Sequence, residues 1–360
     1  MAKKEYNQEE YIEKQEQLKE QLEQRVKELA EKFRDKPEQI VELLEFSSRF
    51  YKYSQRNVML IYSQNEGATF VESFKGMNDK GYHVKKGQHG MKILVPVKTT
   101  LLNDNGNWIK LSNATKEQKQ AYKNGQIESR TVQRFKVGTV FDISQTDCPI
   151  EDYPKLYNMG YKNERHDQLY NAVKEYAEKV LSCTVVESDV SSISLRGFYY
   201  PLKNEIHISD KLQDTEKLST LLHELAHAVL HKQPNIDKPI AQIEFEADAL
   251  SIMLQSKLGI EVTEGGQRHL ANHFREFESI IENNKNAPES TLSKTNGNKT
   301  PDINTVLHNV SEQYRDMIDV FEETVSESLA QQNSTLTQEQ MLTARDICYE
   351  QSFSNEMTML

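Results

Sequence analysis

The stretch that decides the fold of the second half of this chain is Leu221-Leu222-His223-Glu224-Leu225-Ala226-His227-Ala228-Val229-Leu230-His231. Its apolar residues recur at helical rather than strand spacing, which predicts a helix. On that helix His223 and His227 project from one face, one turn apart, where two neutral imidazoles can bind one zinc ion. Glu224 is placed to hold a water molecule rather than the metal. The segment is an HExxH motif, in which the glutamate accepts a proton from a zinc-polarised water.

A zinc site of this kind needs a third protein ligand, and the segment 243–250 supplies candidates. It reads as a second helix on which Glu244 and Asp248 share a face while Glu246 points away from them. We predict that Glu244 is the third ligand and that Asp248 accepts the far N–H of a ligand histidine. Prolines at 234 and 239 provide the break between the two helices.

Two less specific interpretations apply to the same histidines. HExxH also arises by chance on buried helices, where the imidazoles are merely hydrogen-bonded, but the downstream Glu-x-x-x-Asp favours zinc. His231 lies one further turn along and lacks the glycine spacing of a zincin with a third histidine ligand. We therefore predict a structural role for His231.

The length and composition of the chain limit its class. A chain of 360 residues is long enough for two domains plus extensions. No apolar run approaches the length of a membrane span and the first residues do not resemble a signal peptide, so we expect a cytoplasmic protein with no membrane partner. Its three cysteines are too far apart and odd in number for a disulfide scaffold.

The first half of the chain combines helical and β patterns. Residues 5–34 carry an apolar stripe at helical spacing (Leu18, Leu22, Val26, Leu29, Phe33), and a second helix is expected from Pro37 to about Gln64. Short segments of β character follow at 68–71, 92–97 and 131–143, with a polar, turn-rich excursion at 104–128. These patterns predict a small α+β domain.

Charge distinguishes this domain from the rest of the chain. The whole chain has a net charge of -11, yet residues 49–98 are rich in lysine and arginine, with aromatic residues between them (Tyr51, Tyr53, Tyr62, Phe70, Phe74, Tyr82). Cations that contact phosphates and aromatics on which bases stack are typical of single-strand binding surfaces. A solvated basic face over an aromatic core explains the composition equally well.

The segment 81–94, which reads GYHVKKGQHGMKIL, resembles the N-terminal DNA-binding domain of the ArdC/LtrC antirestriction family. The segments 57–64 and 140–146 resemble its flanking motifs, so the likeness covers roughly residues 40–147. The family occurs on plasmids and conjugative elements, and its N-terminal domain is associated with single-stranded DNA. The chain departs from the family at Met77 and Tyr82, where tryptophan and arginine are usual. The resemblance implies single-stranded DNA as a partner. Among the basic and aromatic residues of this domain, we expect DNA contacts from Arg56, Lys75, Tyr82, Lys85, Lys86 and Lys92.

The second half of the chain resembles an ImmA/IrrE-type metallopeptidase domain. An amphipathic helix at 166–181, a hairpin of Gly197–Tyr200 with Glu205–Ile208, HELAH and EFEAD follow one another in the same order as in that domain. In zincins the edge strand beside the metal can align an extended peptide. A zincin also needs a group that stabilises the oxyanion, and Tyr199, Tyr200, His207 and His231 remain alternatives.

We expect an α+β protein with four segments: an N-terminal helix (1–36), a single-stranded-DNA-binding domain (37–148), a zinc metallopeptidase domain (150–282), and a linker with a tail (283–360). The tail forms two helices, at 305–331 and 337–353, or is disordered. Two functions compete. One is a zinc endopeptidase that cleaves a repressor, a restriction component or another DNA-bound protein. The other is a non-catalytic DNA-protecting antirestriction protein with a structural or vestigial zinc site. Glu224 favours the enzyme, since a structural site needs no general base.

Overall fold

The computed structural model describes residues 8–153, 165–189, 196–233, 238–286 and 301–357. The chain divides into two compact units: unit 1 comprises Met1–Glu31 and Arg56–Pro154, and unit 2 comprises Lys32–Gln55 and Lys155–Leu360. Each unit combines helices with a small sheet, which confirms the predicted α+β class. No described helix is long and apolar enough to cross a membrane.

The first helix, α1 (Gln8–Asp35), buries the stripe predicted from the sequence. Leu22, Val26, Leu29 and Phe33 are all less than 10% exposed. These positions follow three- and four-residue steps, which return to the same face of a helix.

The single helix expected from Pro37 to Gln64 is wrong. A short 3-10 turn, η1 (Pro37–Gln39), precedes α2 (Ile40–Arg49), and a turn then separates α2 from α3 (Gln55–Gln64). The reason lies far along the chain. The Arg315 guanidinium donates to the carbonyls of Tyr51 (2.6 Å) and Tyr53 (2.7 Å), so these acceptors are not used to continue the helix.

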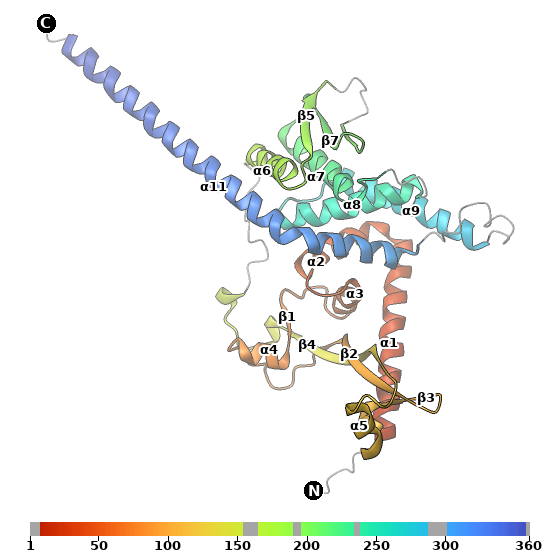
Figure 1. Cartoon of the computed structure of the whole chain (residues 1–360). Helices are drawn as coiled ribbons and strands as arrows, with labels where there is room; N and C mark the ends of the chain where they lie inside the picture. Colours follow the sequence, from red (N-terminus) through yellow and green to blue (C-terminus); the bar gives the residue numbers. More distant parts are fainter. Residues whose placement is uncertain (1–7, 154–164, 190–195, 234–237, 287–300, 358–360) are drawn as a thin grey trace. The chain divides into compact units, whose positions relative to one another are not determined.

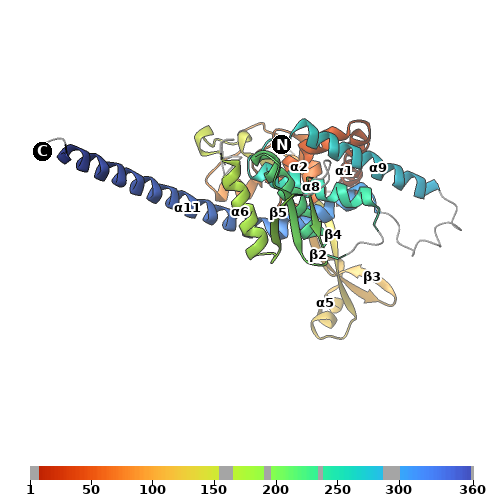
Figure 2. The same ribbon diagram turned by 90° about the horizontal axis from the view of Figure 1, so that it is seen from above.

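Unit 1 contains an antiparallel sheet with the strand order β1-β4-β2-β3. Its strands are β1 (Val71–Ser73), β2 (Met91–Asp104), β3 (Asn107–Lys110) and β4 (Ser129–Asp142). The long strands β2 and β4 pair from Met91↔Val140 to Leu102↔Ser129. The excursion expected at 104–128 contains β3, the 3-10 turn η2 (Leu111–Asn113) and α5 (Lys116–Lys123), which lie at one end of the β2–β4 ribbon (Figure 2).

Asn57 and Gln64 of α3 hydrogen-bond to backbone N–H and carbonyl groups of β2 that no neighbouring strand pairs. Asn57 accepts from the Leu94 N–H and donates to the Leu94 carbonyl, both at 2.9 Å. Gln64, two turns later, makes the same pair of bonds with Lys92. Unpaired backbone groups at a sheet edge are costly when buried, so these two amides complete the sheet.

Unit 2 contains a mixed sheet with the order β5-β7-β6. The strands β6 (Gly197–Tyr200) and β7 (Glu205–Ser209) form the predicted hairpin, and β5 (Thr184–Ser188) pairs parallel to β7. Asn204 in the hairpin turn has φ of 53°, a left-handed conformation that asparagine tolerates better than most residues. Ile206 and Ile208 of β7 are fully buried.

The helices of unit 2 lie around α8 (Ile240–Lys257). It packs on α7 (Asp214–Leu230), α9 (Glu264–Asn286), α2 and α11 (Ile303–Met357), and α6 (His166–Lys179) packs on α7 and α11 (Figure 1). Most of α8 is buried, including Gln242, Glu246 and Asp248. A helix buried on all sides must find partners for its charged residues inside the protein.

The tail differs from the prediction. The two expected helices, 305–331 and 337–353, are one continuous helix, α11, and no glycine or proline interrupts its sequence. The predicted stripe is buried in unit 2 (Val306, Val310, Tyr314, Ile318, Phe321). The ring of Phe321 meets that of Tyr176 on α6 edge-on at 5.0 Å. The helix α9 extends to Asn286, beyond the expected start of the linker, most of which lies outside the described residues.

The two units follow different bounds from the four segments drawn on the sequence. Residues 32–55, which include α2, belong to unit 2, and so does all of α11. Burial explains the assignment of α2, because its apolar face packs against α8. Sequence spacing cannot show which distant helix an apolar face will contact.

Candidate metal centre

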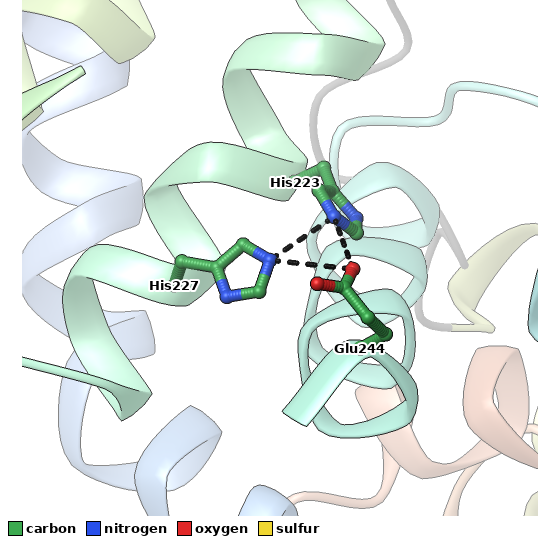
Figure 3. A group of neighbouring side chains, drawn as sticks. All are labelled: His223, His227 and Glu244. Carbon is green, nitrogen blue, oxygen red and sulfur yellow. Dashed lines mark hydrogen bonds and ion pairs between the residues drawn. The ribbon is translucent and has the colours of Figure 1, made fainter. Parts of the chain in front are cut away.

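Three side chains from two helices converge in unit 2. His223 and His227 come from α7 and Glu244 from the first turns of α8 (Figure 3). The two Nε2 atoms are 3.2 Å apart, and Glu244 Oε2 lies 3.4 Å from His223 Nε2 and 3.6 Å from His227 Nε2. Tetrahedral ligands with bonds of about 2.0–2.1 Å are separated by roughly 3.3–3.4 Å. The three donors therefore fit around one tetrahedral ion.

Apolar packing holds these donors in place. Leu218, Leu221, Leu222 and Leu225 of α7 are buried on one side of the helix, and α7 packs along α8. The ligand histidines occupy the adjoining face, where each is only partly exposed. The same periodicity that builds the core thus directs both imidazoles toward Glu244.

Asp248 lies behind His223. Its Oδ1 is 3.1 Å from His223 Nδ1, so the ring turns Nε2 toward the other two donors. Burial acts to lower the pKa of His223, but the bonds to Asp248 and Glu244 outweigh burial and raise that pKa to about 10. Burial likewise acts to raise the pKa of Asp248, and its histidine partners lower it well below the usual range.

His231 and Glu246 form a relay of polar contacts behind His227. Its Nδ1 lies 3.0 Å from His231 Nδ1, and His231 Nε2 lies 2.9 Å from Glu246 Oε2. If Nε2 of His227 serves as a metal donor, its Nδ1 carries the proton, so we assign Nδ1 of His231 as the acceptor and its Nε2–H as the donor to Glu246. His231 is buried, and burial lowers its pKa. These contacts place His231 where it can orient His227, and its structural role stays a prediction.

Glu224 has the surroundings expected of a general base. It is 7% exposed, and burial raises its pKa. Its carboxylate accepts a backbone hydrogen bond from Tyr199 on β6, and it is not one of the three grouped donors. A glutamate close to a metal, not bound to it, with a raised pKa is suited to take a proton from water.

The hairpin narrows the choice of oxyanion-stabilising residue. Gly197, whose added Cβ would meet Thr220 of α7, lies on the same sheet face as Tyr199, Ile206 and Ile208. By strand alternation Tyr200 and His207 lie on the opposite face, where His207 stacks on Phe198. Of the three hairpin residues considered for stabilising the oxyanion, Tyr199 alone lies on the side of α7. Its hydroxyl donates a hydrogen bond to Asn204.

The sequence interpretation missed two histidines. His269 and His273 of α9 lie with their Nδ1 atoms 3.1 Å and 2.9 Å from Asp248 Oδ2. Their four-residue spacing, in the segment HLANH, is the same signal that identified His223 and His227. Without an adjoining glutamate or a known distance to Asp248, that spacing has little specificity.

The candidate DNA contacts lie in unit 1. Lys85 and Lys86 are exposed in a turn closed by a bond from the Gln88 N–H to the Lys85 carbonyl. Gly87, its third residue, has φ of 89°, which favours glycine. The turn is anchored by Gln145, whose carbonyl accepts from the Lys85 N–H and whose side chain donates to the His89 carbonyl.

Of the other candidate contacts, two are paired within unit 1, one is exposed and one is packed against a buried cluster. Arg56 pairs with Glu23 of α1 at 3.0 Å, and Lys92 donates to Thr139 at 2.8 Å. Lys75 is exposed on α4 (Phe74–Asp79). Tyr82 packs against the buried cluster of Met77, Ile143 and Cys148. Both positions at which the sequence departs from the resembled family are therefore packing positions here.

The interleaved aromatics are divided between the two units and differ in burial. Tyr51 and Tyr53 belong to unit 2, Tyr62 is buried, and Phe70 joins the cluster around Met77. Phe74 is 53% exposed. Two of the cations within residues 49–98, Arg49 and Lys52, likewise belong to unit 2.

Two protein families match separate parts of this chain. Residues 178–283 match the Peptidase M78 family, described as the IrrE N-terminal-like domain, and residues 8–141 match the N-terminal domain of anti-restriction factor ArdC. The chain therefore combines an ArdC N-terminal domain with an IrrE-type, Peptidase M78 domain, as the resemblances in the sequence predicted. The ArdC match includes the Lys85–Gln88 turn, and the Peptidase M78 match includes His223, His227 and Glu244.

The chain is also similar to individual proteins and solved structures. An uncharacterized protein of Bacillus anthracis, pXO2-81, is 29% identical over 328 residues, which are 83% of this chain and 54% of that protein. The chain thus spans about half the length of this curated relative. Crystal structures of the antirestriction ArdC protein from plasmid R388, metal-free and Mn(II)-bound, are 15% and 16% identical with TM-scores of 0.43 and 0.41. They cover 76% of this chain and 86% and 85% of that protein.

Proposed function

We propose that this protein is a zinc-dependent metallo-endopeptidase whose ArdC-type domain binds single-stranded DNA, and that it acts in antirestriction or conjugative-element biology. The observation that supports the peptidase most directly is Glu224, which is buried with a raised pKa beside the three donors yet is not one of them. Two histidines and a glutamate are a donor set of catalytic zinc sites. The Peptidase M78 match supports the same reaction class.

The residues have separable roles in this proposal. A divalent ion held by His223, His227 and Glu244 would supply Lewis acidity to the attacking water and the peptide carbonyl. Glu224 accepts the proton of the water and returns it to the leaving amine nitrogen. In the part of the chain that the structure describes, β6 pairs with β7 alone, so its outer edge can align an extended substrate by backbone pairing.

Glu224→Gln tests the peptidase. The change keeps the side-chain shape and removes the base, so proteolysis should fall by roughly two to four orders of magnitude while metal content and folding stay unchanged. Glu216→Gln is the matched control, because Glu216 lies in the first turn of the same helix. Proteomes of host cells expressing each form would identify cleaved proteins. If the Glu224→Gln proteome and DNA protection both match wild type, the non-catalytic antirestriction function is the correct one.

The DNA-binding part of the proposal rests on the ArdC N-terminal match and on the exposed Lys85–Lys86 turn. Lysines that contact phosphates release counterions, so affinity for a labelled single-stranded oligonucleotide should fall steeply with salt. Lys85→Glu with Lys86→Glu in the full chain should weaken binding at least tenfold. Lys116→Glu with Lys123→Glu on α5 makes the same charge change in the same unit and should have a smaller effect. Equal losses in both pairs would mean that net charge, and not this turn, governs binding.

A further inference from the structure

A second group of donors lies beside the first. Among the described residues, Asp248, His269 and His273 also place three possible metal ligands close together. Asp248 comes from α8 and both histidines from α9, and α8 packs along α9. The side chains of Asp248 and His273 are 9% and 19% exposed, whereas that of His269 is 55% exposed. A solvent path therefore reaches the group from the His269 side.

The carboxylate of Asp248 contacts both groups. Oδ1 faces Nδ1 of His223 at 3.1 Å. Oδ2 faces Nδ1 of His273 at 2.9 Å and Nδ1 of His269 at 3.1 Å, and the same His269 atom lies 3.2 Å from Oδ1. Ligands at right angles around an ion with bonds of about 2.1 Å lie about 3.0 Å apart. The two spacings to Oδ2 fit an octahedral ion, and the two Nδ1 atoms lie within 4.8 Å of each other. The wider spacings of the first group fit a tetrahedral ion.

The charge around Asp248 also differs from that around the other buried carboxylate of α8. Glu246 pairs with the Lys238 ammonium at 2.8 Å as well as with His231. No lysine or arginine of the described chain pairs with Asp248, which contacts three imidazoles instead. A buried carboxylate is stable only when a cation or hydrogen bonds compensate it. An ion between Oδ2 and the two Nδ1 atoms would compensate this carboxylate in place of its hydrogen bonds to His269 and His273.

We propose that Asp248, His269 and His273 form a second site for a divalent transition-metal ion, separate from the His223–His227–Glu244 site and joined to it through the Asp248–His223 contact. Two imidazoles and one carboxylate favour Mn(II), Fe(II), Co(II), Ni(II) or Zn(II) over Ca(II) and Mg(II). Water fills the remaining positions on the exposed side. The site goes beyond the proposed peptidase, because it has its own ligands and its occupancy does not depend on Glu224.

The test measures metal stoichiometry in the full-length protein. Chelator-stripped protein is dialysed against Mn(II) and, separately, Zn(II), and bound metal per chain is measured by mass spectrometry. Wild type should bind two ions of at least one metal. His269→Ala with His273→Ala should bind one, and His223→Ala should also bind one, since it removes the first site alone. His308→Ala, an exposed histidine of α11, is the control and should bind two.

His269→Ala alone guards against misfolding of the double variant, because this side chain is the most exposed of the three. It should weaken the second ion at least tenfold and leave the first unchanged. One ion in wild type, two ions in the folded double variant, or loss of the first ion in His269→Ala would each overturn the second site. None of these measurements involves proteolysis, so they distinguish failure of this inference from failure of the proposed peptidase.

Discussion

Replacing His231 tests whether the relay behind His227 tunes the metal centre. His231→Leu removes the acceptor 3.0 Å from His227 Nδ1 and the donor 2.9 Å from Glu246. Loss of such an outer partner lowers metal affinity by roughly 10–100-fold, which corresponds to about 1.4–2.7 kcal/mol. Glu246 keeps Lys238 and Gln242 as partners, so the carboxylate is not left unpaired. The fold should therefore survive the change.

His231→Asn sharpens this test, because the Asn side-chain oxygen can occupy the place of Nδ1 and still accept from His227. Its metal affinity should lie much closer to wild type than that of His231→Leu. Competition with a chelating indicator at fixed pH gives both dissociation constants, and circular dichroism checks the fold. Wild-type affinity in His231→Leu would refute the relay. Equal weakening in both variants would show that only the shape of the imidazole matters.

Three further outcomes follow from the structure. The pKa of His223 is raised to about 10, so below that pH a metal ion must displace the proton of His223. Apparent metal affinity should therefore rise about tenfold per pH unit from pH 7 to 9. An affinity that does not change with pH, measured by isothermal titration calorimetry, would contradict the assignment of His223 as a ligand. Asn57→Ala leaves the Leu94 N–H and carbonyl unpaired and should lower the free energy of unfolding by about 2 kcal/mol in urea, whereas the exposed Asn113→Ala should change it by less than about 0.5 kcal/mol. Arg315→Met removes the bonds to the Tyr51 and Tyr53 carbonyls and should lower the free energy of unfolding by about 1.5–3 kcal/mol. The exposed Arg268→Met is the control, and equal stability of the two variants would exclude Arg315 as a stabilising partner of the turn after α2.

Local spacing in the sequence determined the helix that carries the centre, the hairpin beside it and the α+β class. The i, i+4 separation of His223 and His227 is a property of one helix, and the Pro201–Asn204 turn is a property of one hairpin. Such features depend on residues only a few positions apart, so periodicity and turn chemistry are enough to predict them. Glu244 was also predictable, because its helix follows soon after α7.

Only the tertiary structure decided which distant groups meet. It brought His269 and His273 of α9 to Asp248, and it placed Glu246 against His231. It also ended α2 near Phe50, since Arg315 of α11 binds carbonyls that a longer helix would have used. Each of these contacts joins residues 15 to about 265 positions apart. A one-dimensional pattern records which face of a helix is apolar or charged, whereas packing in three dimensions selects the partner of that face.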